Sequence, residues 1–175
     1  QVYRYMDIGT AKPTPQERAL IPHHLIDVVD PDEDFTLAHY QQMAYGAIED
    51  IQRRGKLALL VGGSGLYVRA VVGGFHIPQV PPDAELRRRL EQRAAREGVM
   101  ALYEELKMSD PEGARRIDPR NIRRVIRAIE VSRHAGVPLS QLQRSEPPFR
   151  TVVIGLTTDR EDLYRRIDNR VDGMI

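Results

Sequence analysis

The sequence contains no cysteine, no excess of charge of either sign and no long apolar run. Without cysteine, disulfides and thiolate metal sites are excluded, and a reducing, cytoplasmic location is expected. No stretch approaches the roughly 20 apolar residues that a membrane-spanning helix needs, so we expect no membrane partner. The 26 lysines and arginines nearly balance the 25 aspartates and glutamates. The net charge of +1 does not by itself indicate a nucleic-acid-binding protein.

The charged residues are nevertheless unevenly placed along the chain. Acidic residues dominate 27–34, whereas arginines cluster at 87–96, 115–127 and 160–170. A basic face is therefore expected on a protein whose average charge is close to neutral. The hydrophobic fraction of 41% suffices for one ordinary domain, or for a compact core with a smaller insertion.

The first half of the chain predicts loop, helix and strand in turn. Glycines and prolines punctuate residues 1–30, which predicts loop with one short strand, HLIDVV, at 24–29. Apolar residues then recur at helical spacing over 36–54, a segment that Thr36 or Asp34 can cap. The continuous apolar run LALLVGG, at 57–63, is typical of a strand covered on both faces.

A helix is expected from Ser64, and a boundary follows at 75–82, where proline and glycine interrupt the pattern. Beyond this boundary no strand pattern appears until TVVIGLTT, at 151–158, after which 159–175 predicts an amphipathic helix. Four helical patterns lie between, at 83–98, 99–110, 110–117 and 121–136. We therefore predict an α/β core over 1–74, an all-helical insertion over 75–148, and a return to the core over 149–175.

The segment YMDIGTAKPT, residues 5–14, combines an acid, a hydroxyl, a lysine and a glycine without a periodic pattern. As an active-site loop it would place Lys12 and Thr10 near a diphosphate, with Asp7 holding the loop or a metal. Gly9 would allow close backbone approach. A surface turn with solvated charges fits the same residues equally well.

The turn GGSGLY, at 62–67, lacks the lysine and the spacing of a phosphate-binding P-loop. Its glycines indicate a tight turn at a strand end. Ser64 therefore fits a helix cap at least as well as a ligand contact.

Arginines in three helical segments are candidates for anion binding. Arg123 and Arg127 lie four residues apart, on one face of the helix predicted at 121–136, where they could follow a phosphate backbone. Arg87 is near a helix N-terminus, an unfavourable place for a cation, which suggests that it has a use there. Arg166 and Arg170 share a helical face and could reach an anion. Solvated surface charge is the competing explanation for Arg123 and Arg127, whereas Asp162 and Asp168 offer nearby helical ion-pair partners to Arg166 and Arg170.

Five segments, taken in order, resemble the tRNA dimethylallyltransferase (tRNA isopentenyltransferase) family: QVYRYMDIGTAKPT, PHHLIDVVDP, LLVGGSGLY, DPRNIRRVIRAIEV and LYRRIDNRVDGMI. The resemblance implies a P-loop NTPase-like parallel-sheet core with a helical insertion that contacts tRNA. It also implies transfer of a dimethylallyl group from dimethylallyl diphosphate, with Mg2+ support. The acceptor would be the exocyclic amine of the adenosine 3′ of the anticodon, in the tRNA anticodon stem-loop. We expect a monomer.

The resemblance also assigns roles to individual residues. Asp7, Thr10 and Lys12 fall in the loop beside the donor site, and Arg166 and Arg170 would approach the diphosphate. The family's phosphate-binding loop and general base would precede Gln1, so no catalytic residue and no metal ligand is assigned here, and these residues alone are expected to be inactive. The positions matched to tRNA contact are Gln1, Ser64, Arg87, Arg123, Arg124, Val125, Ile126 and Arg127.

Three other functions remain open at this stage. An adenylate isopentenyltransferase would use the same donor on a free nucleotide, although the long helical insertion argues against it. A noncatalytic RNA-binding module would need only the arginine-rich helices. A nucleotide kinase is disfavoured because no Walker lysine is visible.

Overall fold

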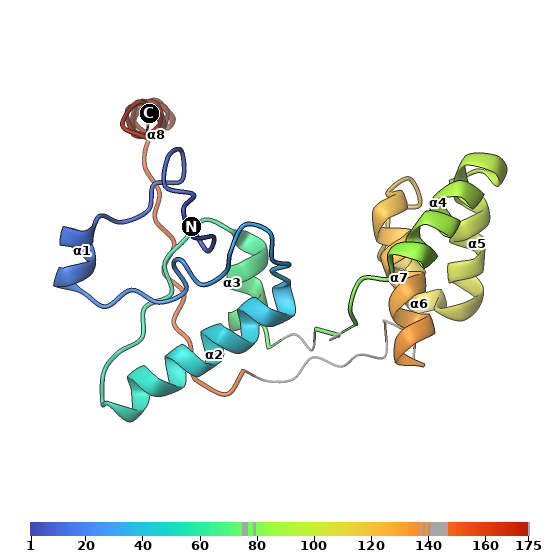
Figure 1. Cartoon of the computed structure of the whole chain (residues 1–175), viewed down its shortest axis with the longest axis horizontal. Helices are drawn as coiled ribbons and strands as arrows, with labels where there is room; N and C mark the ends of the chain where they lie inside the picture. Colours follow the sequence, from blue (N-terminus) through green and yellow to red (C-terminus); the bar gives the residue numbers. More distant parts are fainter. Residues whose placement is uncertain (75–76, 79, 137, 139, 141–146, 175) are drawn as a thin grey trace. The chain divides into compact units, whose positions relative to one another are not determined.

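The structure, a computed structural model, describes residues 1–74, 77–78, 80–136, 138, 140 and 147–174. The chain divides into two compact units (Figure 1). The first unit combines Gln1–Gly73 with Pro147–Ile175, and the helical unit comprises Gly74–Glu146. No described helix is both long and apolar enough to cross a membrane.

The first unit contains the helices α1 (Pro15–Leu20), α2 (Leu37–Arg53), α3 (Gly65–Val72) and α8 (Arg160–Asp172). The predicted start of α2 is confirmed, because the Thr36 side chain accepts a hydrogen bond from the His39 backbone N–H. Helix α1 was not predicted. Its signal was the capping box at Thr14 and Glu17, in which each side chain accepts from the other residue's backbone N–H.

Aromatic packing joins α2 to its neighbours in the first unit. The Tyr40 ring stacks on Tyr67 of α3 with 4.1 Å between ring centroids, and the Tyr45 hydroxyl donates to the Val71 carbonyl at 3.2 Å. Phe149, which lies after the helical unit in the sequence, makes a T-shaped contact with Tyr45, with 5.5 Å between ring centroids. The two parts of the chain that form the first unit therefore meet on α2.

The predicted strands are not formed in the part of the chain that the structure describes. Residues 57–63 and 151–158 have no strand assignment, and most of their large apolar side chains are exposed. In the segment 24–29, only an isolated parallel bridge joins Tyr3 to Val29. The positive φ angles of Leu25 and Asp27, 61° and 55°, interrupt the extended backbone that a strand requires. An apolar run indicates that its side chains should be buried. A strand also needs a second backbone segment with which its N–H and C=O groups form hydrogen bonds.

The helical unit consists of α4 (Ala84–Glu97), α5 (Val99–Ser109), α6 (Pro111–Arg115) and α7 (Ile122–Ala135) (Figure 1). All four helices were predicted from periodicity, and the structure confirms them. Polar side chains cap three helix starts by accepting backbone N–H groups: Asp83 for α4, Asp110 for α6 and Asn121 for α7. Gly136 ends α7 in the left-handed conformation, with φ of 66°.

The core of the helical unit lies where α4, α6 and α7 pack on α5. Leu102 and Leu106 of α5 and Val125 of α7 are completely buried there. Burying each such side chain contributes about 1.5–3 kcal/mol to folding. Two carboxylates, Asp110 and Glu130, are buried as well, and burial of a charge requires partners.

Candidate functional site

Lys12 is the centre of a hydrogen-bonded network in the N-terminal loop. Its ammonium donates to the Tyr3 carbonyl at 2.6 Å, to Asp7 Oδ1 at 2.8 Å and to Asp27 Oδ1 at 2.6 Å. The Lys12 side chain is only 6% exposed. An ammonium has three hydrogens to donate, and here each has an acceptor.

Asp27 receives a second cation on its other oxygen. Arg18 of α1 donates from Nη2 to Asp27 Oδ2 at 2.7 Å. The hydrogen bonds from Lys12 and then from Arg18 lower the pKa of Asp27, against the opposing effect of burial. Burial would lower the pKa of Lys12, but its bonds to Asp27 and Asp7 outweigh burial and raise that pKa. Both groups therefore stay charged near neutral pH.

Gln1 and Thr10 hold the same loop through its backbone. The Gln1 side-chain amide donates to the carbonyls of Thr10 and Ala11, at 3.1 and 2.6 Å. The Thr10 hydroxyl lies within hydrogen-bond distance of the carbonyls of Met6 and Asp7, at 2.8 and 2.9 Å. Ala11 has a φ of 47°, which is strained for a residue with a Cβ atom. The side chains predicted to bind donor or tRNA therefore determine the shape of this loop.

This arrangement changes what the donor-site residues can do. In this structure Lys12 has no N–H left for a diphosphate, whereas the Asp7 side chain is 71% exposed. Both oxygens of Asp27 face cations, so this carboxylate is not available to a metal ion. No group of three or more His, Cys, Asp or Glu side chains among the described residues could hold a metal ion.

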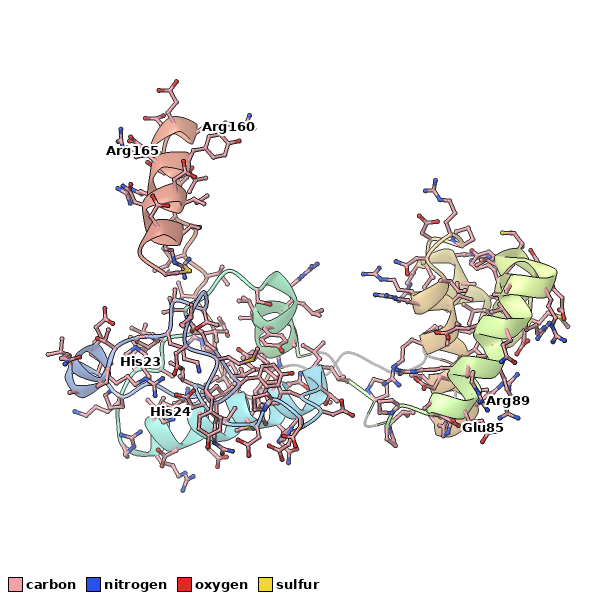
Figure 2. All side chains as sticks on the ribbon, turned by 45° about the horizontal axis from the view of Figure 1, so that its top comes forward. His23, His24, Glu85, Arg89, Arg160 and Arg165 are labelled. Atoms are coloured by element: carbon pink, nitrogen blue, oxygen red, sulfur yellow. The ribbon has the colours of Figure 1, made fainter. Side chains whose placement is uncertain are left out.

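The other candidate positions of the first unit are exposed. Ser64 occupies the N-cap position of α3, but its side chain makes no capping hydrogen bond. Arg166 and Arg170 lie on α8, and no ion pair involves either one within the described residues. Asp162, an ion-pair candidate for them by helical spacing, pairs instead with Arg165, labelled in Figure 2.

A buried carboxylate organises the helical unit. Glu130 of α7 is 0% exposed, and Arg87 of α4 donates to both of its oxygens, each at 2.8 Å. Arg127 donates to Glu130 Oε2 at 2.5 Å, and the Asp83 backbone N–H donates to Oε1 at 2.8 Å. Arg127 also donates to the Val80 carbonyl at 3.0 Å. The network thus holds α4, α7 and residues 80–83 together.

Electrostatics in this network favour the ionised carboxylate. Burial acts to raise the pKa of Glu130, but hydrogen bonds from Arg87, Arg127 and the Asp83 backbone outweigh it and lower that pKa to about 2. The position of Arg87 near the start of α4 was unfavourable by the helix dipole alone. Its pairing with Glu130 supplies the reason for a cation at that position.

The side chains at the five consecutive positions of α7 that were matched to tRNA contact differ in their exposure to solvent. Arg123 and Arg124 are exposed in the first turn. Val125 and Ile126 are buried in the core, with side chains 0% and 4% exposed, so they offer almost no surface to a partner. Arg127 is held by Glu130. Of the five side chains, those of Arg123 and Arg124 are therefore the most available for contact with RNA phosphates.

Three residues that complete these networks were missed in the sequence. Asp27 and Arg18 lie in segments interpreted as strand and loop, where nothing marks them as partners of Lys12. The ion pair between Glu130 and Arg127 could have been predicted, because Glu130 follows Arg127 by three residues on the same helix. Its second partner, Arg87, is 43 residues away and could not be identified by spacing.

In the sequence, the helical unit interrupts the first unit. The protein is therefore a helical bundle with an internal ion-pair network, inserted into a unit that is built on α2 and α3. The whole chain, residues 1–175, matches the IPP transferase family, and the chain belongs to it.

Curated relatives agree with this assignment. The chain is 58% identical to the tRNA dimethylallyltransferase of Roseiflexus castenholzii, covering all of this chain and 58% of the relative. It is 55% identical to the tRNA dimethylallyltransferase of Herpetosiphon aurantiacus, covering 99% of this chain and 56% of the relative. The chain therefore spans a little over half the length of these relatives.

Solved structures give the same result. A eukaryotic dimethylallyltransferase acting on tRNA matches with a TM-score of 0.77 and 30% identity, over 99% of this chain and 44% of that one. The full-length tRNA isopentenylpyrophosphate transferase from Bacillus halodurans matches with a TM-score of 0.57 and 45% identity. That match covers 99% of this chain and 54% of the other.

Proposed function

We propose that the polypeptide to which these residues belong transfers a dimethylallyl group from dimethylallyl diphosphate to a tRNA adenosine. Membership of the IPP transferase family over residues 1–175 carries this proposal. A relative that acts on tRNA, similar in structure over 99% of this chain, supports RNA as the acceptor. The specific acceptor atom is the exocyclic amine of the adenosine 3′ of the anticodon, presented by the anticodon stem-loop.

The reaction forms a bond between the adenosine amine nitrogen and the allylic carbon while the carbon–oxygen bond to the diphosphate breaks. The amine loses a proton and the diphosphate leaves with the bonding electron pair. Within this chain, Lys12 acts as a positioning residue that fixes the loop 5–14, rather than as a diphosphate ligand. The exposed Arg166 and Arg170 remain proposed as contacts to the diphosphate.

On the RNA side, Arg123 and Arg124 are proposed to contact phosphates, and Gln1 and Ser64 to lie at the RNA surface of the first unit. Arg87 and Arg127 support that surface through Glu130. Mg2+ remains part of the proposal as an ion that enters with the diphosphate. No residue of this chain is assigned to it.

The proposal also includes the parallel sheet that the sequence predicts for the core. The apolar runs 57–63 and 151–158 are proposed to be parallel strands of a P-loop NTPase-like core once the rest of that core is present, since their side chains are otherwise exposed. The longer protein is proposed to be cytoplasmic and monomeric.

Transfer to RNA tests the proposal directly. The full-length polypeptide is incubated with labelled dimethylallyl diphosphate and either an anticodon stem-loop or AMP. Label on the stem-loop, with little on AMP, is the expected result. Preferential labelling of AMP would instead identify an adenylate isopentenyltransferase, and no transfer to either would refute the proposed activity. The 175-residue chain alone is expected to transfer none.

A further inference from the structure

A basic depression lies between α4 and α7 in the helical unit. Its volume is about 290 Å3, and the buried residue Leu90 is one of those that line it. Arg89, Arg93 and Arg96 line it from α4, and Arg133 lines it from α7. Arg89 is labelled on α4 in Figure 2. None of these four arginines is among the residues that the family resemblance assigned to a role.

The charges of the depression are only partly neutralised. Arg93 pairs with Glu97 and Glu105, and Arg133 donates to Glu105 Oε1 at 2.7 Å. Arg89 and Arg96 are exposed, and no ion pair to either is present in the described part of the chain. The four arginines have two glutamates as ion-pair partners, and Glu85 lies one turn before Arg89 on α4, so a smaller excess of positive charge remains on this face.

The spacing of the α4 arginines matches a row of anionic groups. Arg89, Arg93 and Arg96 follow one another at four and three residues, so they share one face of the helix. At about 1.5 Å of rise per residue they extend over about 10 Å of helix axis. The two ends of this row, Arg89 and Arg96, are thus far enough apart to contact different phosphates of one nucleic-acid strand.

The inner arginines of the depression are held in place. Glu105 binds both Arg93 and Arg133, which come from two different helices, so their guanidinium groups are oriented by the fold. The outer pair, Arg89 and Arg96, remains available to make direct contacts.

We infer that this arginine depression is a second RNA-backbone contact surface of the helical unit, with Arg89 and Arg96 as its phosphate ligands. The inference rests on the proposed function, because the tRNA acceptor supplies the phosphates. It adds a surface on α4 and α7 to the contact proposed for the first turn of α7.

The test compares two double variants of the 175-residue chain with equal loss of charge. R89Q/R96Q removes the two outer arginines, and R88Q/R115Q removes two exposed arginines that do not line the depression. Affinity for a fluorescent anticodon stem-loop is measured by anisotropy across a salt series, with poly-glutamate as a second probe. Far-UV circular dichroism verifies that both variants are folded.

R89Q/R96Q is expected to lower the slope of log affinity against log salt by about 2, since each lost phosphate contact removes about 1. A clearly smaller change is expected for R88Q/R115Q. Equal effects of the two variants would overturn the inference while leaving the proposed function intact. Poly-glutamate binding as tightly as RNA, with the same loss in R89Q/R96Q, would replace RNA by an acidic protein. Absence of salt-dependent RNA binding by the unsubstituted chain would overturn the inference, whereas the proposed function is tested separately by transfer to RNA with the full-length polypeptide.

Discussion

Lys12 and Asp27, 15 residues apart, are joined by a 2.6 Å hydrogen bond between the ammonium and a carboxylate oxygen. The bond closes the N-terminal loop on the segment that precedes α2. The same ammonium donates to the Tyr3 carbonyl, next to the backbone pairing between residues 2–4 and 28–29. Lys12 is thus the residue through which the loop 5–14 is fixed.

Replacing Lys12 by Met keeps the length of the side chain but removes all three donated hydrogen bonds. The backbone bonds that Lys12 supports, from Val28 N–H to the Val2 carbonyl and from Arg4 N–H to the Val29 carbonyl, should open more often. Faster hydrogen exchange at the Val28 and Arg4 amides is expected. Lys56→Met is the matched control, because Lys56 is exposed. Unchanged exchange in K12M would contradict the positioning role of Lys12.

Glu130→Gln tests the buried network of the helical unit. The substitution keeps the size of the side chain but removes the negative charge that Glu130 presents to Arg87 and Arg127. Breaking a fully buried pair costs about 3–5 kcal/mol, and we expect about 2–3 kcal/mol here because both arginines are about a third exposed. Urea unfolding followed by circular dichroism measures the loss. Glu91→Gln, at an exposed position of α4, should unfold like the unsubstituted chain.

The same network predicts how stability depends on pH. The folded-state pKa of Glu130, about 2, lies below its ordinary value of 4.5. Its contribution is therefore complete above pH 4.5 and is lost as the pH falls towards 2. The difference corresponds to a loss of up to about 3 kcal/mol. Unfolding free energies measured between these limits should fall more steeply for the unsubstituted chain than for E130Q; parallel curves would exclude Glu130 as the source.

Gly113→Ala and Gly46→Ala should have opposite effects on stability. A Cβ atom on Gly113 would lie 2.1 Å from Asp110 Oδ2, and Asp110 is anchored because Ser140 donates to both of its oxygens. The cap of α6 must then shift, which we expect to destabilise the helical unit by about 1–2 kcal/mol. Gly46 lies within α2 with open space around it, so alanine there should stabilise by about 0.5–1 kcal/mol. Thermal unfolding distinguishes the two signs.

Substitutions at two positions of α7, three residues apart, should affect stability and RNA binding separately. Ile126→Ala leaves a cavity in the core and should cost about 2–5 kcal/mol. Arg123→Gln changes an exposed side chain and should leave stability within about 0.5 kcal/mol, while RNA affinity falls and becomes less salt-dependent. Denaturant titrations and anisotropy report the two properties. RNA affinity that is unchanged in R123Q would remove this residue from the interface.

The sequence predicted the helices better than the contacts between them. Helices such as α2 and α7 follow from apolar spacing and local caps, which lie within a few residues of one another. The partners of Lys12 and Arg87 lie 15 and 43 residues away, and no local rule connects them. The prediction that Lys12 lies near a diphosphate rested on its neighbours in the loop and did not include these partners.

The strand predictions were wrong for a related reason. The run at 57–63 has the composition of a buried strand, but pairing depends on a second backbone segment that composition does not identify. The strand predicted at 24–29 is absent for a local reason, because Leu25 and Asp27 have positive φ angles. Asp27 is thereby in a turn, where it meets both Lys12 and Arg18.

The apolar segments 57–61 and 152–156 also have a consequence for the behaviour of this chain in solution. They combine exposed apolar side chains, such as Leu57 and Leu156, with backbone that forms no described strand. Such segments are templates for intermolecular β-pairing. A net charge of +1 provides little repulsion between molecules. As the concentration of the 175-residue chain rises, aggregation through these two segments should set its solubility while the helical unit is still folded.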